Sequence, residues 1–308
     1  MLFDDYLKKA QTLRTGVVKG YKRPHKPAML LAILSLIENG KLNENKIAYS
    51  PLLLELFKRY FEIVKSQEDS FNPILPFFHL RGDQLIHHKP FPGKEDAYEA
   101  IRTPRSTKQF LDIVSYAYLE EELFSSLRDP EKLNKLRQTI IETYFRKHEI
   151  RIKQIIEDEK DITTYQTKLE GNPGKVGEKI ERTQSRSTAF SRIIREIYDY
   201  RCAACGLRIN LNGLFIIDAA RLIPFSISKD DDPCNGIALC KNHHWAMDKF
   251  LLVPGIDDLW HVSPELDDRL EGCSDIIKLD KRKILLPQLK KYHPKEESLA
   301  WREKRILK

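Results

Sequence analysis

The sequence has few cysteines and no apolar run long enough to cross a lipid bilayer. Its longest apolar segment, residues 29–37, is far shorter than the roughly 20 residues that a spanning helix needs. The first residues, Met1 to Asp5, lack the basic leader and apolar stretch of a secretory signal, so we expect a cytoplasmic protein. The five cysteines of such a protein are not expected to form a disulfide framework, and any that cluster are better interpreted as metal ligands.

Charge of both signs is abundant, with an excess of positive charge. Lysine and arginine number 52 against 45 acidic residues, for a formal net charge of +7, and the sequence pI is about 9.0. This balance favours a polyanionic partner such as nucleic acid, although a basic protein with merely solvated lysines would have the same composition. The 308 residues, 41% of them hydrophobic, are enough for two domains with packed cores.

Residues 1–150 predict one mixed, mainly helical domain. The apolar periodicity and the Pro, Ser and Gly signals at segment ends predict helices at 27–40, 51–61 and 108–150. Residues 77–88 have the pattern of a strand, a turn and a second strand. A charged helical stretch followed by Gly171-Asn172-Pro173-Gly174 then predicts a linker at 151–178. Residues 179–308 form the second domain, and we expect the α+β class for the whole chain.

Two short motifs in the second domain predict a structural Zn²⁺ site. Cys202 and Cys205 form a CxxC motif, and 35 residues beyond Cys205 a CxxH motif contains Cys240 and His243. Each short loop directs two ligands to one ion, as tetrahedral zinc requires. The alternative, ordinary buried thiols or a redox pair, does not account for the second motif. The other thiols have no evident partner and are expected to be buried: Cys234 and Cys273.

The residues around these motifs resemble the ββα-metal core of HNH endonucleases. The resemblance covers Tyr200 to Leu252 and rests on the segments 213–225 and 235–248. The stretches 260–264 and 299–301 also resemble restriction-type HNH proteins. The resemblance implies a zinc-containing nuclease domain that hydrolyses phosphodiester bonds in DNA with a divalent ion, Mg²⁺ or Mn²⁺.

Three family positions carry that chemistry. The resemblance places the orienting asparagine at Asn235 and the helix histidine that holds the catalytic metal at His244, nine residues further on. The first position, where the family has a histidine as general base, is Arg221. Arginine cannot take a proton from water, although it can hold a phosphate bidentately. Either another group or metal-bound hydroxide performs the deprotonation, or the chain is a natural binder that has lost cleavage or a deliberately inactivated variant.

A catalytic metal needs more than one ligand from the protein. Asp248 lies four residues after His244, on the same face of a helix, and is expected to be a ligand or to support one. Asp218 is a weaker candidate, and strand alternation predicts that it points away from Arg221. Three nearby side chains are expected in the core: Trp245, Met247 and Phe250.

The first domain resembles the sulfur-binding domains of type IV restriction enzymes, which recognise phosphorothioate-modified DNA. The resemblance covers Lys22 to Leu85 and rests on residues 23–27, followed by an aliphatic helix, and on residues 75–83. It implies backbone contacts near the first motif and an apolar pocket for sulfur near the second. The residues that it assigns to DNA binding are Arg23, His25, Lys26, Leu75, Pro76, Phe77, His79 and Arg81.

This chain differs from that family at two pocket positions. Leu75 stands where members often have an aromatic residue, and His79 where they often have a small one. An apolar notch can still favour sulfur, because an ordinary phosphate oxygen would lose its hydration there without gaining a partner. In the alternative interpretation, residues 25 and 26 only begin a helix and residues 76–78 belong to the core.

We therefore expect a modification-dependent endonuclease that cuts double-stranded DNA, with phosphorothioate as the mark. A DNA-binding protein without cleavage, and an HNH nuclease that reads a methylated base, are the alternatives. A homodimer would allow two nicks to make a double-strand break. Residues 108–150 could form its interface, although packing within their own domain is the simpler expectation.

Overall fold

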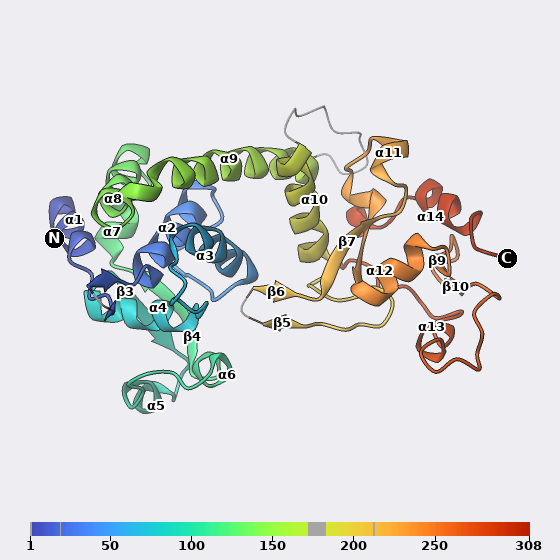
Figure 1. Cartoon of the computed structure of the whole chain (residues 1–308), viewed down its shortest axis with the longest axis horizontal. Coiled ribbons are helices and arrows are strands. Elements are labelled where there is room, and N and C mark those ends of the chain that lie inside the picture. Colours follow the sequence, from blue (N-terminus) through green and yellow to red (C-terminus); the bar gives the residue numbers. More distant parts are fainter. Residues whose placement is uncertain (1, 19, 172–182, 212) are drawn as a thin grey trace. The chain divides into compact units, whose positions relative to one another are not determined.

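The computed structural model describes residues 2–18, 20–171, 183–211 and 213–308. It divides into two compact units, Met1–Glu159 and Lys160–Lys308 (Figure 1). Both units combine helices with small two-stranded antiparallel sheets, which confirms the predicted α+β class. Among the described residues, no helix has the length and apolar character needed to cross a membrane.

The division between the units falls inside a helix, α9 (Glu149–Gly171). This helix occupies the first part of the predicted linker at 151–178. Residues 172–178 lie outside the described residues, as do the last three residues of the predicted break at Gly171-Asn172-Pro173-Gly174. The assignment of a linker at 151–178 therefore stays a prediction.

The first unit is mainly helical. Its helices are α1 (Phe3–Gln11), α2 (His25–Glu38), α3 (Pro51–Val64), α4 (Ile74–His79), α5 (Glu95–Glu99), α6 (Thr107–Leu111), α7 (Glu121–Ser126) and α8 (Pro130–Tyr144), with the 3-10 turns η1 (Leu80–Asp83) and η2 (Arg146–His148). Its paired strands are β1 (Val17–Val18) with β2 (Tyr21–Lys22), and β3 (Ile86–Pro90) with β4 (Val114–Leu119).

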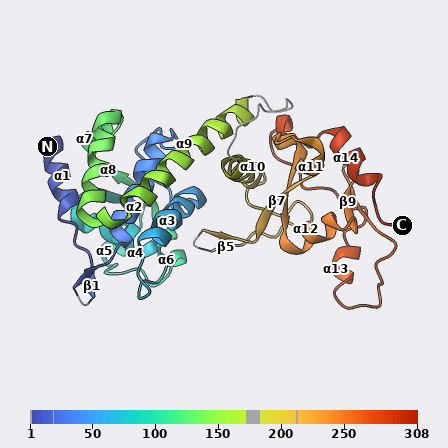
Figure 2. The same cartoon turned by 45° about the horizontal axis from the view of Figure 1, so that its top comes forward.

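Helix α2 forms the centre of this unit. Every residue from Pro27 to Leu36 is buried, and the helix packs against α3, α4 and α8 (Figure 2). A helix that is apolar on all sides is stable only in such a core position. Helix α3 begins at the predicted residue, because the Ser50 side chain accepts a hydrogen bond from the Leu53 amide and Pro51 fits the first turn.

Two predictions of secondary structure in this unit were wrong. Residues 77–79 belong to helix α4 and not to a strand, and residues 114–119 form strand β4 and not a helix. Strand β4 pairs with β3, with His88 opposite Ala117. Short apolar segments fit both periodicities, and the pairing of residues about 30 positions apart along the chain decided between them.

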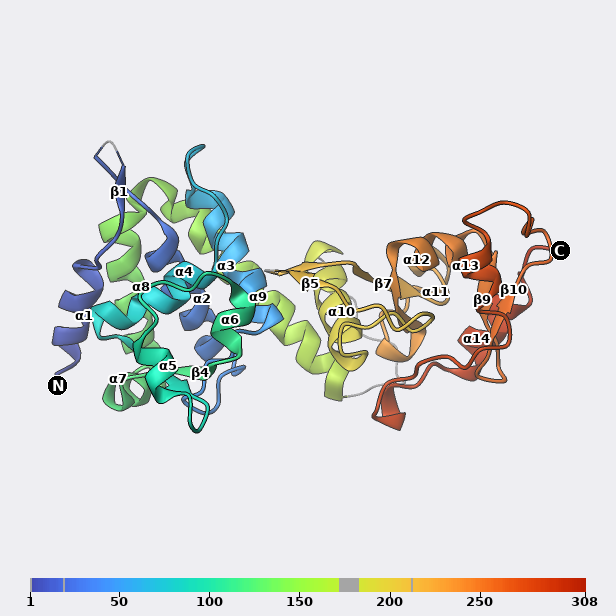
Figure 3. The same ribbon diagram turned by 90° about the horizontal axis from the view of Figure 1, so that it is seen from below.

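The second unit is built on a two-stranded sheet between two helices. Strand β7 (Ile217–Arg221) pairs with β8 (Gly236–Cys240), and α10 (Thr183–Ile197) and α12 (Lys241–Asp248) both pack on β7 (Figure 3). Gly236 permits this packing, because a Cβ at that position would lie 2.3 Å from the Ile194 side chain. The other elements are β5 (Asn210–Leu211), β6 (Leu214–Phe215), α11 (Phe225–Ser228), η3 (Pro233–Asn235), β9 (Leu252–Pro254), β10 (Trp260–Val262), α13 (Ser274–Ile277), η4 (Lys290–Tyr292) and α14 (Glu296–Glu303).

Helix α12 corrects a further expectation. Met247 is fully buried as predicted, but 57% of Trp245 is exposed to solvent. The inner face of this short helix is occupied by His243, Ala246 and Met247. Trp245 falls outside that stripe, so its large apolar side chain is available for contact with a partner.

Candidate functional site

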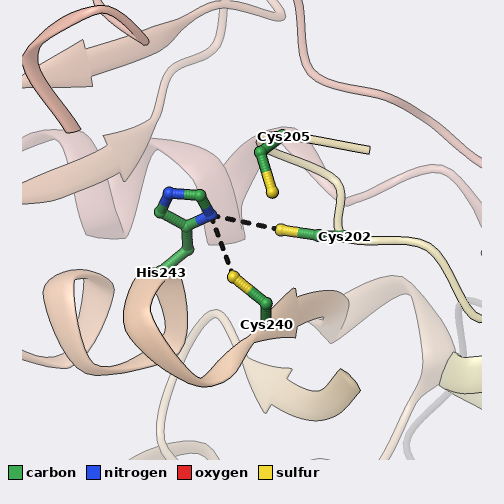
Figure 4. Close-up of side chains that lie close together, drawn as sticks. All are labelled: Cys202, Cys205, Cys240 and His243. Atoms are coloured by element: carbon green, nitrogen blue, oxygen red, sulfur yellow. Dashed lines mark hydrogen bonds between the residues drawn. The ribbon is translucent and has the colours of Figure 1, made fainter. Parts of the chain in front are cut away.

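The side chains of Cys202, Cys205, Cys240 and His243 converge on one point (Figure 4). One ligand atom from each lies within 4.8 Å of the others. The His243 Nδ1 atom is 3.3 Å from Cys202 Sγ and 3.2 Å from Cys240 Sγ. Tetrahedral zinc with ordinary bond lengths would separate such atoms by about 3.5 Å. Three sulfurs and one imidazole nitrogen at this spacing fit Zn²⁺.

The electrostatics of the cluster also suit a metal. The Cys240 thiol has a lowered pKa because it shares a hydrogen bond with Cys202 and also lies beside His243. The same hydrogen bond, together with burial, raises the pKa of Cys202. The cluster therefore favours one thiolate, the form of cysteine that binds zinc. Among the described residues, no other group of three or more such side chains converges in this way.

Helix α12 begins directly after Cys240, contains His243, and presents a second group of polar side chains. His244 lies between two carboxylates: its Nδ1 is 3.3 Å from Asp218 Oδ2, and its Nε2 is 3.5 Å from Asp248 Oδ2. Lys241 holds Asp218 through contacts of 2.6 and 2.7 Å. Asp248 and His244 thus offer an oxygen and a nitrogen side by side, as the spacing of four residues predicts.

Asn235 holds the loop that follows β7. It is 1% exposed, and its side chain accepts a hydrogen bond from the Ile223 amide at 2.9 Å and donates one to the Ile223 carbonyl at 3.0 Å. The backbone carbonyl of Asn235 accepts from the amide of Leu222. These bonds fix the end of the strand that carries Arg221.

Arg221 points into a buried ion-pair network. Its Nη2 and Nε donate to Asp231 Oδ1 at 2.6 and 3.2 Å, and its guanidinium lies 4.2 Å from the centre of the Phe190 ring on α10. The Asp231 side chain is 1% exposed. Its other oxygen accepts from Arg186 at 2.6 Å and from the Tyr165 hydroxyl at 3.1 Å.

The structure therefore directs Arg221 away from His244, the predicted catalytic histidine. Asp218 contacts α12, whereas Arg221 contacts α10 and the loop that contains Asp231. Within the described part of the chain, no hydrogen bond or ion pair joins Arg221 to His244. The opposite directions of Asp218 and Arg221 agree with the expected alternation along β7.

The sequence interpretation missed Asp231 and Arg302. Asp231 stands in the run Asp230-Asp231-Asp232, an acidic loop whose burial has no local signal in the sequence. Arg302, on α14, donates to backbone carbonyl groups about 80 and 55 residues away. Such contacts cannot be inferred from periodicity or spacing.

In the first unit, several predicted DNA contacts gather where α2 begins and α4 ends. Lys26 Nζ lies 2.6 Å from Asp83 Oδ2. Burial, followed by the charges of Lys26 and Arg81, lowers the pKa of His79. Leu75 and His79 lie one turn apart on α4 and are both half-buried.

The remaining predicted contacts differ in how accessible they are. His25 hydrogen-bonds the Ser70 carbonyl at 2.9 Å, and Arg23 is 4.0 Å from Asp69. Arg81 stacks on Phe78 and donates to a backbone carbonyl. Two predicted residues are buried in the core and present no accessible side chain: Pro76 and Phe77.

Comparison with known proteins identifies part of the second unit. Residues 202–253 match a family model described as HNH endonuclease. The match contains the cluster of three cysteines and one histidine, strands β7 and β8, and helix α12. The chain thus has an HNH endonuclease domain at these positions, and such domains are nucleases that act on DNA with the help of a metal.

The other comparisons add little. No curated protein matches the chain. Among solved structures, it is similar to the protein titled "Modification dependent TagI restriction endonuclease", at 16% sequence identity and a TM-score of 0.32. The similarity covers 44% of this chain and 42% of that protein, so the chain spans less than half of its length.

Proposed function

We propose that the chain is a modification-dependent DNA endonuclease. The observation that carries this proposal is the HNH match at residues 202–253, within which β7, β8 and α12 place His244 between Asp218 and Asp248. The structural zinc would hold the two motif loops together. The first unit would select the DNA, and the second would cut it.

His244 and Asp248 would hold the catalytic ion, Mg²⁺ or Mn²⁺. When bound, such an ion polarises the scissile phosphate and lowers the pKa of a coordinated water. Asp218 would accept a hydrogen bond from the Nδ1–H group of His244, which leaves Nε2, on the side of Asp248, available as a ligand. Asn235 would fix the loop beside this group through its two bonds to Ile223.

We propose that the surface formed by Lys26, Leu75, His79 and Arg81 reads the modification. The lowered pKa of His79 favours a neutral imidazole, and Leu75 one turn away adds an apolar wall. A phosphorothioate sulfur is larger and less strongly hydrated than oxygen, so it would lose less on entering such a site. Lys26, Arg81 and the more exposed Arg23 would attract the DNA backbone.

Binding to paired DNA duplexes, with and without one phosphorothioate linkage, tests whether this surface recognises the modification. We expect the modified duplex to bind at least tenfold more tightly, and His79→Ala or Leu75→Ser to remove most of that preference. His87→Ala is the matched control, because His87 is half-buried on β3 and pairs with Glu120. Equal affinity for both duplexes would exclude the sulfur mark, and a panel of duplexes with methylated bases would then identify the mark.

A second candidate function is DNA binding without efficient cleavage. The pairing of Arg221 with Asp231 favours it, because the position that carries the general base in HNH enzymes is occupied by a structural ion pair. Loss of a general base slows such reactions by about 10²–10⁴-fold. Digestion with Mg²⁺ or Mn²⁺ by the natural chain, Arg221→His and His244→Ala distinguishes the two. Cleavage only by Arg221→His supports the binding protein, and cleavage by the natural chain that His244→Ala abolishes supports the nuclease.

A further inference from the structure

Arg302 comes from outside the HNH match and reaches into its centre. It belongs to α14 (Glu296–Glu303), whereas the match ends at residue 253. Its side chain is 2% exposed. A buried guanidinium is unfavourable unless its donors are satisfied, so the partners of Arg302 indicate what it does.

Three nitrogens of Arg302 bind three backbone carbonyls. Nε donates to Leu222, and Nη2 donates to Arg221 at 2.8 Å. Arg221 ends β7, and Leu222 follows it directly. Nη1 donates to Met247 at 2.9 Å, in the last turn of α12. The last carbonyls of a helix lack partners within the helix and carry a partial negative charge, which a cation stabilises. One side chain thus joins the strand and the helix of the ββα core.

Arg302 also faces the candidate metal ligands. Its Nη2 lies 3.6 Å from Asp248 Oδ1, while the other carboxylate oxygen, Oδ2, lies 3.5 Å from His244 Nε2. The Asp248 carboxylate therefore lies between Arg302 and His244. Burial lowers the pKa of Arg302 to about 10, which leaves the guanidinium charged at neutral pH.

We propose that Arg302 is a positioning residue of the nuclease site. It sets the orientation of Asp248 toward His244 and fixes the position of α12 relative to β7. Helix α14 is then part of the active site and not only a tail. This inference rests on the proposed nuclease function for its consequence in catalysis. Its structural content, a clamp between β7 and α12, is independent of that function.

The test compares Arg302→Lys and Arg302→Ala with Arg305→Ala. Arg305 is the matched control, because it lies two residues beyond the end of α14, is exposed and stacks on Trp301 at 3.9 Å. The first readout is Mn²⁺ affinity of the zinc-loaded chain by electron paramagnetic resonance, with His244→Ala as the reference for loss of the site. We expect Arg302→Ala to weaken Mn²⁺ binding by about 10–100-fold, with Arg302→Lys intermediate and Arg305→Ala unchanged.

Chemical rescue separates positioning from general loss of stability. Millimolar guanidinium ion should restore part of the Mn²⁺ affinity of Arg302→Ala, whereas the same concentration of urea should not. The second readout is amide hydrogen exchange. We expect faster exchange confined to residues 221–223 and 247–250, with residues 202–206 of the zinc cluster unchanged.

These readouts distinguish failure of the inference from failure of the proposed function. If Arg302→Ala and Arg302→Lys bind Mn²⁺ like the natural chain and exchange normally at 221–223 and 247–250, the inference is overturned. If the natural chain binds Mn²⁺ no better than His244→Ala, the proposed metal site is wrong. Hydrogen exchange of Arg302→Lys then tests the clamp between β7 and α12 by itself. Faster exchange confined to residues 221–223 and 247–250 supports the clamp. Unchanged exchange, or faster exchange throughout the second unit, overturns it.

Discussion

Asp231 is the ion-pair partner of Arg221, the arginine that stands where HNH enzymes have their general base. It accepts hydrogen bonds from Arg221, Arg186 and Tyr165 while almost completely buried. A buried carboxylate with two guanidinium partners is stable only as a set, because each charge compensates for the desolvation of the others. Replacement of Arg221 by histidine would leave Asp231 paired with Arg186, so we expect that variant to fold.

Removing the Asp231 carboxylate should destabilise the second unit more than Arg221→His does. Asp231→Asn leaves two half-buried guanidinium groups without this carboxylate, and we expect the second unit to lose about 3 kcal/mol of stability. Urea denaturation followed by tryptophan fluorescence measures this unit alone, because all three tryptophans lie in residues 160–308. The exposed Asp268→Asn is the control, and an Asp231→Asn midpoint equal to that of the control would contradict the network's role.

His88 makes the first unit sensitive to acid. It is 6% exposed, hydrogen-bonds Tyr98 and the Phe77 carbonyl, and burial lowers its pKa from 6.5 to about 4. The folded state therefore excludes a proton that the unfolded state binds below pH 6.5, and stability should fall as the pH falls from 6.5 to 4. The loss expected over that range is about 3 kcal/mol.

Hydrogen exchange of peptides from α2 measures this pH dependence in the intact chain. His88→Gln should be less stable at pH 7 but should lose less stability between pH 6.5 and 4 than the natural chain. An identical loss in both proteins would assign the acid sensitivity to other groups.

At the scale of elements, the sheet of β7 and β8 adjoins the candidate zinc cluster. Cys240 ends β8 and His243 lies in the first turn of α12, so a bound zinc would fix the strand-to-helix junction. The CxxC loop is tied to the same sheet through the hydrogen bond from the Ala203 amide to the Ala238 carbonyl. Because α12 also carries His244 and Asp248, the zinc would position the candidate catalytic residues indirectly.

We therefore expect one zinc per chain and its loss on substitution of a ligand. Cys240→Ala should lower the zinc content measured by plasma mass spectrometry and destabilise the second unit, while hydrogen exchange in α2 and α3 stays unchanged. Cys273→Ser is the matched control, because Cys273 lies outside the cluster. Full zinc content in Cys240→Ala, or its loss in Cys273→Ser, would show that the ligand set is wrong.

At the scale of the whole molecule, positive charge is concentrated near the end of the sequence. Residues 278–308 contain eleven lysines and arginines and four acidic residues. Lys281, Arg282 and Lys283 are exposed, and the bridge between Leu259 and Lys283 places this segment beside β10. A cationic segment on the nuclease unit fits contacts with DNA phosphates that do not depend on sequence.

Substitution of these three residues by alanine should weaken DNA binding without changing the preference for modified DNA. If all three neutralise phosphates, the slope of log K against log salt should decrease by about 2–3. The triple variant of Arg146, Lys147 and Arg151, which are exposed in the first unit, is the charge-matched control. An equal decrease in both triple variants would indicate general electrostatic attraction and not a specific surface.

Local features of this protein could be predicted from its sequence. The convergence of the four candidate zinc ligands follows from two short motifs, the approach of Asp248 to His244 from a spacing of four residues on a helix, and the start of α3 from Ser50 and Pro51. In each case the distance between the groups is set by a few backbone angles, so spacing along the chain determines spacing in three dimensions.

Only the tertiary structure decided the features that join distant segments. The pairing of β3 with β4, the exposure of Trp245, the network at Asp231 and the reach of Arg302 to β7 each depend on which elements pack together. Burial of a polar group leaves no periodic signal, because its compensating partners can stand anywhere along the chain. The sequence thus determined the ligands of the metal sites proposed for the nuclease unit, and the fold decided what holds them in place.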